Sequence, residues 1–280
     1  MTPTRVRHVL TRKRAVLRDS ITVVRHTVRA LRHSRLLLGT VGGTIALTAV
    51  ALLAWRQFSP DGTSASRSIA HSVVVGVRFL AVISMQFLVA TWLFATFLGD
   101  TPPRFRQLLN SLARRLPEFA VCAALLAWCE HASDATTSSA IARMAVSFGF
   151  NYVLSYAIPA AAVYDTGIVH AFRGTYRALR STFGADILAW SGVWIVNGAI
   201  SLVGAIPDAL DIYQPGADGS RYSLAGRLFN WLVLMPTGVA AQAIGAAFVT
   251  VIFFALERNT APAHFPKGAV ETVSGLQLDD

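Results

Sequence analysis

The chain alternates between long apolar runs and short basic or polar segments. Six of these runs approach the ~20 residues that an α-helix needs to cross the ~30 Å hydrocarbon core of a bilayer. The runs are Leu36–Trp55, Ser72–Leu98, Leu116–His131, Met144–Val163, Ile187–Ile206 and Phe229–Leu256. Four of them carry no charged side chain. This pattern predicts an all-α polytopic membrane protein with six transmembrane helices.

The third run is the shortest of the six. Its 16 residues would make a helix of ~24 Å at ~1.5 Å per residue, so we expect it to borrow residues from the basic segment before it. Pro117 suits the first turn of a new helix, where its missing N–H has no intrahelical partner. Glu118 would then be stabilised by the helix dipole. The sequence therefore predicts that a helix begins near this proline.

Basic amphipathic segments precede the first, third and fifth runs. In each segment, apolar residues recur at spacings of three and four, so they share one face of a helix. The apolar faces are Ile21, Val24, Val28 and Leu31 in the first segment, Phe105, Leu108, Leu109, Leu112 and Leu116 in the second, and Ile168, Phe172, Tyr176, Leu179 and Phe183 in the third. We expect three interfacial helices that lie on the cytoplasmic surface of the membrane.

These segments also indicate an internal repeat. The first and third share the pattern Thr-X-Arg-Ala-Leu-Arg, at Thr27–Arg32 and Thr175–Arg180, whereas the second matches only loosely. Each segment is followed by two apolar runs. We therefore expect three hairpin repeats, each led by a surface helix and related by an axis along the membrane normal, as in the parallel repeats of some transporters.

Composition agrees with a membrane protein and identifies a partner for the basic charge. Apolar residues make up 54% of the chain and charged residues 14%, against ~25% charged in soluble domains. The net charge is +10, and its arginines cluster beside apolar runs, which favours anionic lipid over nucleic acid. We expect lipid-headgroup or partner contacts at Arg25, Arg29, Arg32, Arg114, Arg115, Arg173, Arg177 and Arg180.

The positions of Lys and Arg predict the orientation of the chain in a cell (plasma) membrane. Nineteen of the 25 fall on one set of helix ends, which includes both termini, and five fall on the other. Basic residues favour the cytoplasmic side, so both termini should be cytoplasmic. The chain then consists of a basic N-terminal helix (residues 1–35), a six-helix membrane domain (36–256) and a flexible cytoplasmic tail (257–280). Its 23 arginines against two lysines are typical of a GC-rich prokaryotic genome.

Polar side chains within the apolar runs are the candidates for function. They are Arg78, Gln86, Asn151, Asn197 and Gln242. A charge inside a membrane helix is costly, so Arg78 either forms a structural ion pair or has a functional role. Its expected partner is Glu130, Asp134 or Asp208. The four amides either join helices by hydrogen bonds or line a polar path.

Sequence motifs for catalysis are absent: there is no Walker loop, HExxH, GxSxG or Cys/His ligand set. Cys122 and Cys129 are seven residues apart, ~10 Å along a helix, which is too far for a disulfide. We therefore expect no cofactor, no metal and no enzymatic activity. Gly39 and Gly43 stand at GxxxG spacing, which either allows close approach of another helix or reflects the usual glycine content of membrane helices.

The passage from Tyr156 to Gly184 joins an apolar helix containing Pro159 to a basic amphipathic helix by way of an acid and a glycine. Asp165, Gly167 and Ala171 complete the pattern. It resembles a group of poorly characterised six-helix prokaryotic membrane proteins, which is similar to the membrane region of some glycerophosphodiester phosphodiesterases. Tyr164 stands where that group more often has an acid. The resemblance implies a fold and a membrane location, not an activity.

Together these features predict a non-enzymatic integral membrane protein that serves as an accessory or scaffold subunit of a membrane assembly. Its partner would be another membrane protein or a second copy of the chain. The alternative is a transporter or channel for a small solute or lipid. A scaffold would bury its polar side chains in bonds between helices, whereas a transporter needs them to line a polar cavity that reaches the midplane.

Overall fold

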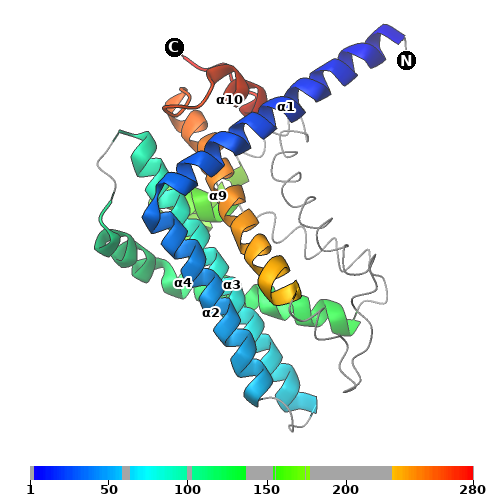
Figure 1. The fold of residues 1–280 in the computed structure, drawn as a ribbon, viewed down its shortest axis with the longest axis vertical. Coiled ribbons are helices and arrows are strands. Elements are labelled where there is room, and N and C mark those ends of the chain that lie inside the picture. Colours follow the sequence, from blue (N-terminus) through cyan, green and yellow to red (C-terminus); the bar gives the residue numbers. More distant parts are fainter. Residues whose placement is uncertain are drawn as a thin grey trace.

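The computed structural model of the chain is all-helical in the part that it describes (Figure 1). The described residues are 3–58, 64–99, 103–136, 154, 156–173, 175–176 and 229–279. Most of the predicted fourth run, residues 144–163, and all of the fifth run, residues 187–206, lie outside them.

A right-angle break joins the first two helices. α1 (Pro3–His33) and α2 (Arg35–Phe58) are separated only by Ser34, and the axes of their adjoining parts differ by 92°. Ser34 Oγ accepts a 3.2 Å hydrogen bond from the backbone N–H of Leu37, and so satisfies one of the donors that the first turn of a helix leaves free. The boundary between the basic N-terminal segment and the first apolar run therefore lies within a residue of its predicted place.

Two described helices are long and apolar enough to cross a membrane. One is Ser72–Phe97, the greater part of α3 (Ser64–Phe97), and the other is Leu232–Arg258, which joins the end of η2 (Asn230–Leu234) to α9 (Met235–Arg258). The bent α1–α2 pair makes a third candidate if it is counted as one span. The described part of the chain thus contains two or three candidate spans of the six predicted.

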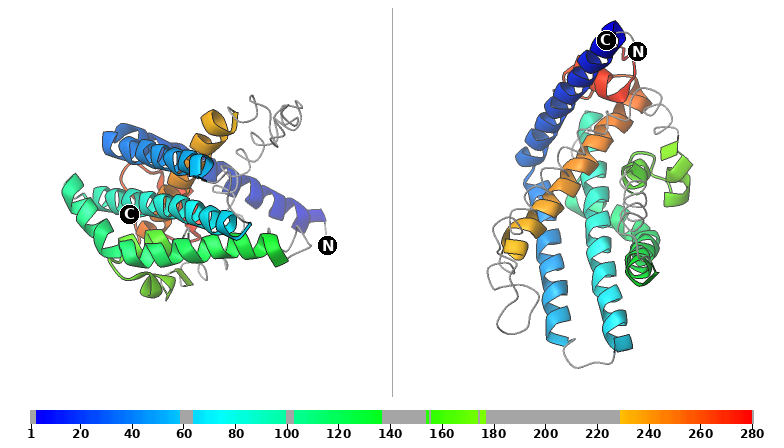
Figure 2. Two further views of the ribbon diagram at one scale, coloured as in Figure 1. Left: turned by 90° about the horizontal axis from the view of Figure 1, so that it is seen from below. Right: turned by 90° about the vertical axis from the view of Figure 1, so that its right-hand side faces the viewer.

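α3 lies at the centre of the described helices, against α2, α4 (Phe105–Thr136) and α9 (Figures 1 and 2). One of its faces carries Met85, Val89 and Leu93, which are buried against α2 and α9. Another carries Phe87, whose ring meets that of Phe119 of α4 edge-on at a centroid distance of 5.2 Å. An apolar helix that is buried on more than one side suits a position inside a bundle.

α4 corrects the prediction that a new helix begins at Pro117. The proline lies inside a continuous helix that joins the second basic segment to the third apolar run. Leu108, Phe119 and Leu126 are buried and continue one helical face across the proline. Burial of this face offsets the ~3 kcal/mol that an interior proline costs a helix. The second interfacial helix is therefore not a separate element.

The prediction that the three repeat units are alike is also wrong for the first two units. The first unit breaks by 92° between its surface segment and its apolar run, whereas the second continues through Pro117 as one helix. Ser34 caps the new helix in the first unit, whereas the packing of α4 against α3 holds the second unit as one helix through Pro117. Most of the third unit lies outside the described residues.

Residues 156–163 and 168–173 form two short helical stretches beside α4 and α9. Ile158 and Ile168 pack in one cluster with Phe119 of α4, and Tyr156 packs in another with Phe253 of α9. These stretches include parts of the fourth apolar run and the third amphipathic segment. The turn between them is therefore fixed from two sides.

The tail expected to be flexible contains α10 (Lys267–Ser274), which packs against α1 and α9 (Figure 2). Val270, Val273 and Leu278 are buried with Val23 of α1 in one apolar cluster. Near the end of the chain, the backbone N–H of Asp279 donates a 2.7 Å hydrogen bond to the carbonyl of Asn259, the C-cap of α9. The prediction overlooked this packing, which joins the two ends of the chain.

Candidate functional site

The side-chain amides of Gln86 and Gln242 meet between α3 and α9. Gln86 Nε2 donates a 2.8 Å hydrogen bond to Gln242 Oε1, and Gln86 is only 4% exposed. Their sequence neighbours Met85 and Ala243 belong to a buried apolar cluster shared by α3 and α9. A hydrogen bond between membrane helices contributes about 0.6 kcal/mol on average and up to about 1.7 kcal/mol. The structure therefore brings two of the five candidate polar residues together as a contact between helices.

Arg78 stands apart from this pair, although it is also on α3. It lies eight residues before Gln86, ~12 Å along the helix, and its side chain is exposed. Asn151, Asn197 and the three carboxylates expected as partners of Arg78 have no described side chains. The pairing of Arg78 and the polar path thus stay predictions.

A charged junction joins α4 to the turn at residues 164–167. Arg115 Nη2 donates a 2.7 Å hydrogen bond to the backbone carbonyl of Asp165, and it lies 3.5 Å from the Asp165 carboxylate. Glu118 Oε2 accepts a 2.7 Å hydrogen bond from the backbone N–H of Ile168, the first residue of the next helical stretch. Arg115 Nη1 and Glu118 Oε1 are 3.5 Å apart. Glu118 therefore caps a helix other than its own, which corrects the role expected for it at the start of a helix.

The residues that carry the family resemblance build this junction. Asp165 adopts a left-handed backbone conformation with φ of 44°, which reverses the chain between the two helical stretches. Gly167 leaves room for the carboxylate, because a Cβ there would lie 3.3 Å from Glu118 Oε1. Ala171 is fully buried beside Tyr156 and Phe253. Each residue has a steric role that is visible in the structure.

Tyr164, the departure from the group's pattern, connects the same turn to α9. Its hydroxyl donates a 2.6 Å hydrogen bond to Glu257 Oε1, and its ring meets that of Phe253 edge-on. Asp165 and Gly167 stand out in the sequence, but their contacts with Arg115 and Glu118 do not. These contacts span about 50 positions, so periodicity within a helix gives no sign of them. The opposite charges of Arg115 and Glu118, three residues apart on one helix, were the one local sign of the charged junction.

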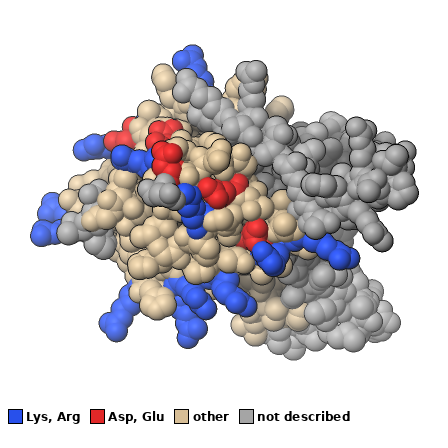
Figure 3. Space-filling view, turned by 90° about the horizontal axis from the view of Figure 1, so that it is seen from above, with Lys and Arg blue, Asp and Glu red and all other residues tan. Residues whose placement is uncertain are grey.

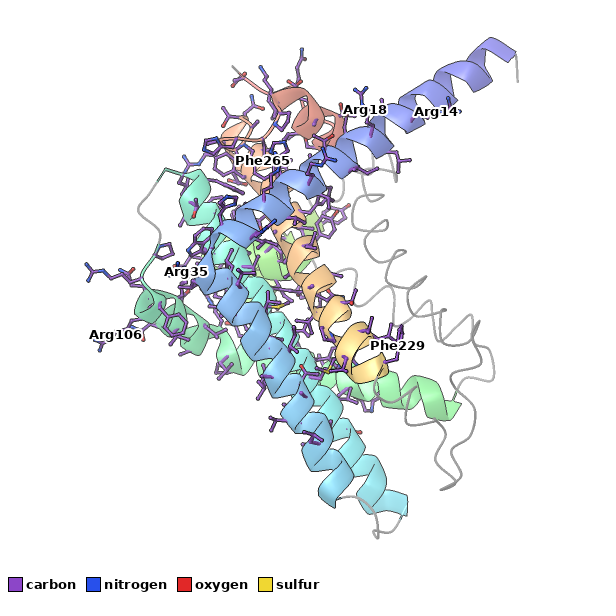
Figure 4. All side chains as sticks on the ribbon, in the orientation of Figure 1. Arg14, Arg18, Arg35, Arg106, Phe229 and Phe265 are labelled. Carbon is purple, nitrogen blue, oxygen red and sulfur yellow. The ribbon has the colours of Figure 1, made fainter. Side chains whose placement is uncertain are left out.

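The arginines expected to contact lipid or a partner are mostly exposed. Arg25, Arg29, Arg32, Arg114 and Arg173 are exposed, Arg115 is half-buried in the charged junction, and Arg177 and Arg180 lie outside the described residues. Figure 4 shows the labelled Arg14, Arg18 and Arg35 towards the end of the molecule at which α2 begins, whereas Arg106 lies out to one side at the start of α4. Seen from above, most Lys and Arg lie at the outline of this end, and Asp and Glu are grouped further in (Figure 3). We call this end the arginine-rich end.

No known family model, curated protein or solved structure matches the chain. Within the described residues, no group of three His, Cys, Asp or Glu side chains is placed to hold a metal ion. The candidate sites are therefore the glutamine pair, the charged junction and the arginine-rich end. The first two connect helices, and the third is a surface.

Proposed function

We propose that the chain is a non-enzymatic integral membrane protein that serves as an accessory or scaffold subunit of a membrane assembly. The observation that carries this proposal is the bond between Gln86 and Gln242. These amides were candidates to line a polar path, and in the structure they bond to each other between α3 and α9. A buried polar contact of this kind fixes how two helices pack, which a scaffold requires.

The charged junction supports the same proposal. Arg115 and Glu118 of α4 bind the turn before Ile168, and Tyr164 of that turn binds Glu257 of α9. These polar side chains thus hold three parts of the chain together. The exposed arginines of the arginine-rich end remain available to an external partner.

We also propose six spans in a cell membrane with both termini cytoplasmic. The distribution of Lys and Arg supports this orientation. The packing of α10 against α1 supports the placement of the two ends on one side, because Val23 shares a cluster with Val270 and Val273. We further propose that Asp165, Gly167 and Ala171 reflect membership of the six-helix group that the sequence resembles, and their separate steric roles support this.

Gentle solubilisation of the tagged full-length protein, followed by identification of co-purifying proteins, tests the proposed function. We expect a stable partner, or a second copy of the chain, at fixed stoichiometry. The variant carrying both Gln86→Leu and Gln242→Leu should retain that partner, because leucines can pack in place of the amide pair. A protein that purifies alone and moves a solute into vesicles, with transport abolished in this variant, would instead establish the transporter.

A further inference from the structure

The exposed side of α1 carries a row of large apolar side chains that are partly exposed. Leu17, Ile21 and Val28 are 41%, 47% and 39% exposed. They are distinct from the buried row of α1, which consists of Val16, Ser20, Val23, Thr27 and Leu31 and in which Val23 packs against α9 and α10. At 3.6 residues per turn the two rows lie about a quarter of a turn apart. α1 therefore has a second apolar face of its own.

Arginines continue the exposed face of α1 beyond this apolar row. They are Arg14, Arg18, Arg25, Arg29 and Arg32, and all five are exposed. Around the helix the order is thus a packed face, an open apolar row and an arginine row. Asp19, the acid in this stretch, lies 3.4 Å from Arg18 through its Oδ1 atom and is mostly covered, so the outer face is strongly positive.

The direction of α1 suits a membrane surface. Its axis is bent by 92° from α2, so when α2 crosses the bilayer, α1 lies in the plane of the headgroups. An interfacial helix buries its apolar face ~5–10 Å into the boundary between headgroups and acyl chains. Arginines beside that face reach the lipid phosphates with their charged ends while their stems cover apolar surface.

We propose that the outer face of α1 is a binding surface for anionic phospholipid, with Leu17, Ile21 and Val28 among the acyl chains and the arginine row on the phosphates. This deepens the proposed function by naming lipid, not an acidic protein, as the partner of this face. It rests on the membrane location in that proposal but not on the accessory role. The apolar row favours lipid as the partner of this face. An acidic protein could bind through the arginines alone and would leave the apolar row without a role.

Spin-labelled lipids test the preference directly. The full-length protein is reconstituted in phosphatidylcholine, and association with spin-labelled phosphatidylglycerol is compared with that of spin-labelled phosphatidylcholine. Replacement of both Arg25 and Arg29 by Gln should weaken the preference for phosphatidylglycerol by about thirtyfold, since each of the two basic residues near an anionic surface contributes ~1 kcal/mol. The matched variant with Lys at both positions should keep most of it. An unchanged preference in the Gln variant, or an equal loss in the Lys variant, would overturn the proposal.

A fluorescent probe tests the apolar row without removing an arginine. In protein whose Cys122 and Cys129 are replaced by Ala, NBD is attached to Ile21→Cys or, as a control, to Thr22→Cys. A nitroxide on a shallow acyl carbon should quench the first probe several-fold more than the second. Equal quenching would overturn the placement of the row in lipid. Both measurements are independent of co-purification, so the absence of a protein partner would contradict only the accessory role.

Discussion

Glu118 accepts a 2.7 Å hydrogen bond from the backbone N–H of Ile168, fifty positions further along the chain. The carboxylate belongs to the interior of α4 and satisfies a donor at the start of another helical stretch. Arg115, one turn earlier on α4, binds the carbonyl of Asp165 in the same turn. The two side chains together fix where the chain re-enters the helix bundle.

Replacement of Glu118 by Ala should lower stability by about 1–2 kcal/mol, because it removes both a helix cap and a charged acceptor. The matched Glu118→Gln variant keeps an acceptor oxygen and should lose about half as much. Thermal unfolding of the purified protein in one detergent measures the difference. If both variants unfold at the same temperature as the wild type, the hydrogen bond to Ile168 contributes nothing to stability.

Gly167→Ala tests the space beside the same carboxylate. The new Cβ would lie 3.3 Å from Glu118 Oε1, so the carboxylate must move by a few tenths of an ångström, which weakens its hydrogen bond to Ile168 at a cost of about 0.5–1 kcal/mol. Gly268→Ala in α10 is the control, because a Cβ there meets nothing within 4 Å. That substitution should be neutral or stabilise the protein by up to about 1 kcal/mol. Equal effects at both glycines, again by thermal unfolding, would contradict the account of the junction.

A double-mutant cycle tests the glutamine pair. Gln86→Leu or Gln242→Leu alone should destabilise the protein by about 1–2 kcal/mol, because each leaves the other amide without its partner in an apolar cluster. The double variant should lose less than the sum of the two, with a coupling of about 0.6 kcal/mol or more. Additive losses would mean that the two side chains act independently.

Leu278→Ala tests the packing of the C-terminal segment on α1. The side chain is 5% exposed in the cluster that contains Val23, and truncation of a buried leucine costs about 2–5 kcal/mol. We expect faster hydrogen exchange in residues 16–31, with little change in α3. Gln277→Ala, at an exposed neighbouring position, is the control and should leave the exchange of α1 unchanged. Unaltered exchange in both variants would mean that α1 does not depend on this segment.

The helices with uniform composition were predictable from the sequence. The uncharged run from Leu36 and the basic segment before it indicate the α1–α2 boundary. The apolar run from Phe229 corresponds to η2 and α9. α10 was missed because eight residues of mixed polarity resemble a loop. In retrospect, Ala269, Val270 and Val273 gave a short apolar face at helical spacing.

Pro117 and the charged junction could not be read from local pattern. A proline suits the start of a helix, and only the packing of α4 against α3 decides that the helix continues through it. The contacts of Arg115 with Asp165 and of Glu118 with Ile168 depend on how distant segments come together. A hydrogen bond between helices was one of the two roles expected for the amides in apolar helices. The sequence did not indicate that Gln86 would bond to Gln242.

The location of the two chain ends shows whether the arginine-rich end, with α1 and α10, faces the cytoplasm. The measurement uses full-length protein with a small epitope at either terminus, expressed in intact cells and probed before and after permeabilisation. The account predicts that both epitopes become accessible only after permeabilisation, because α1 and α10 pack together. An epitope at either terminus that is accessible before permeabilisation would contradict it.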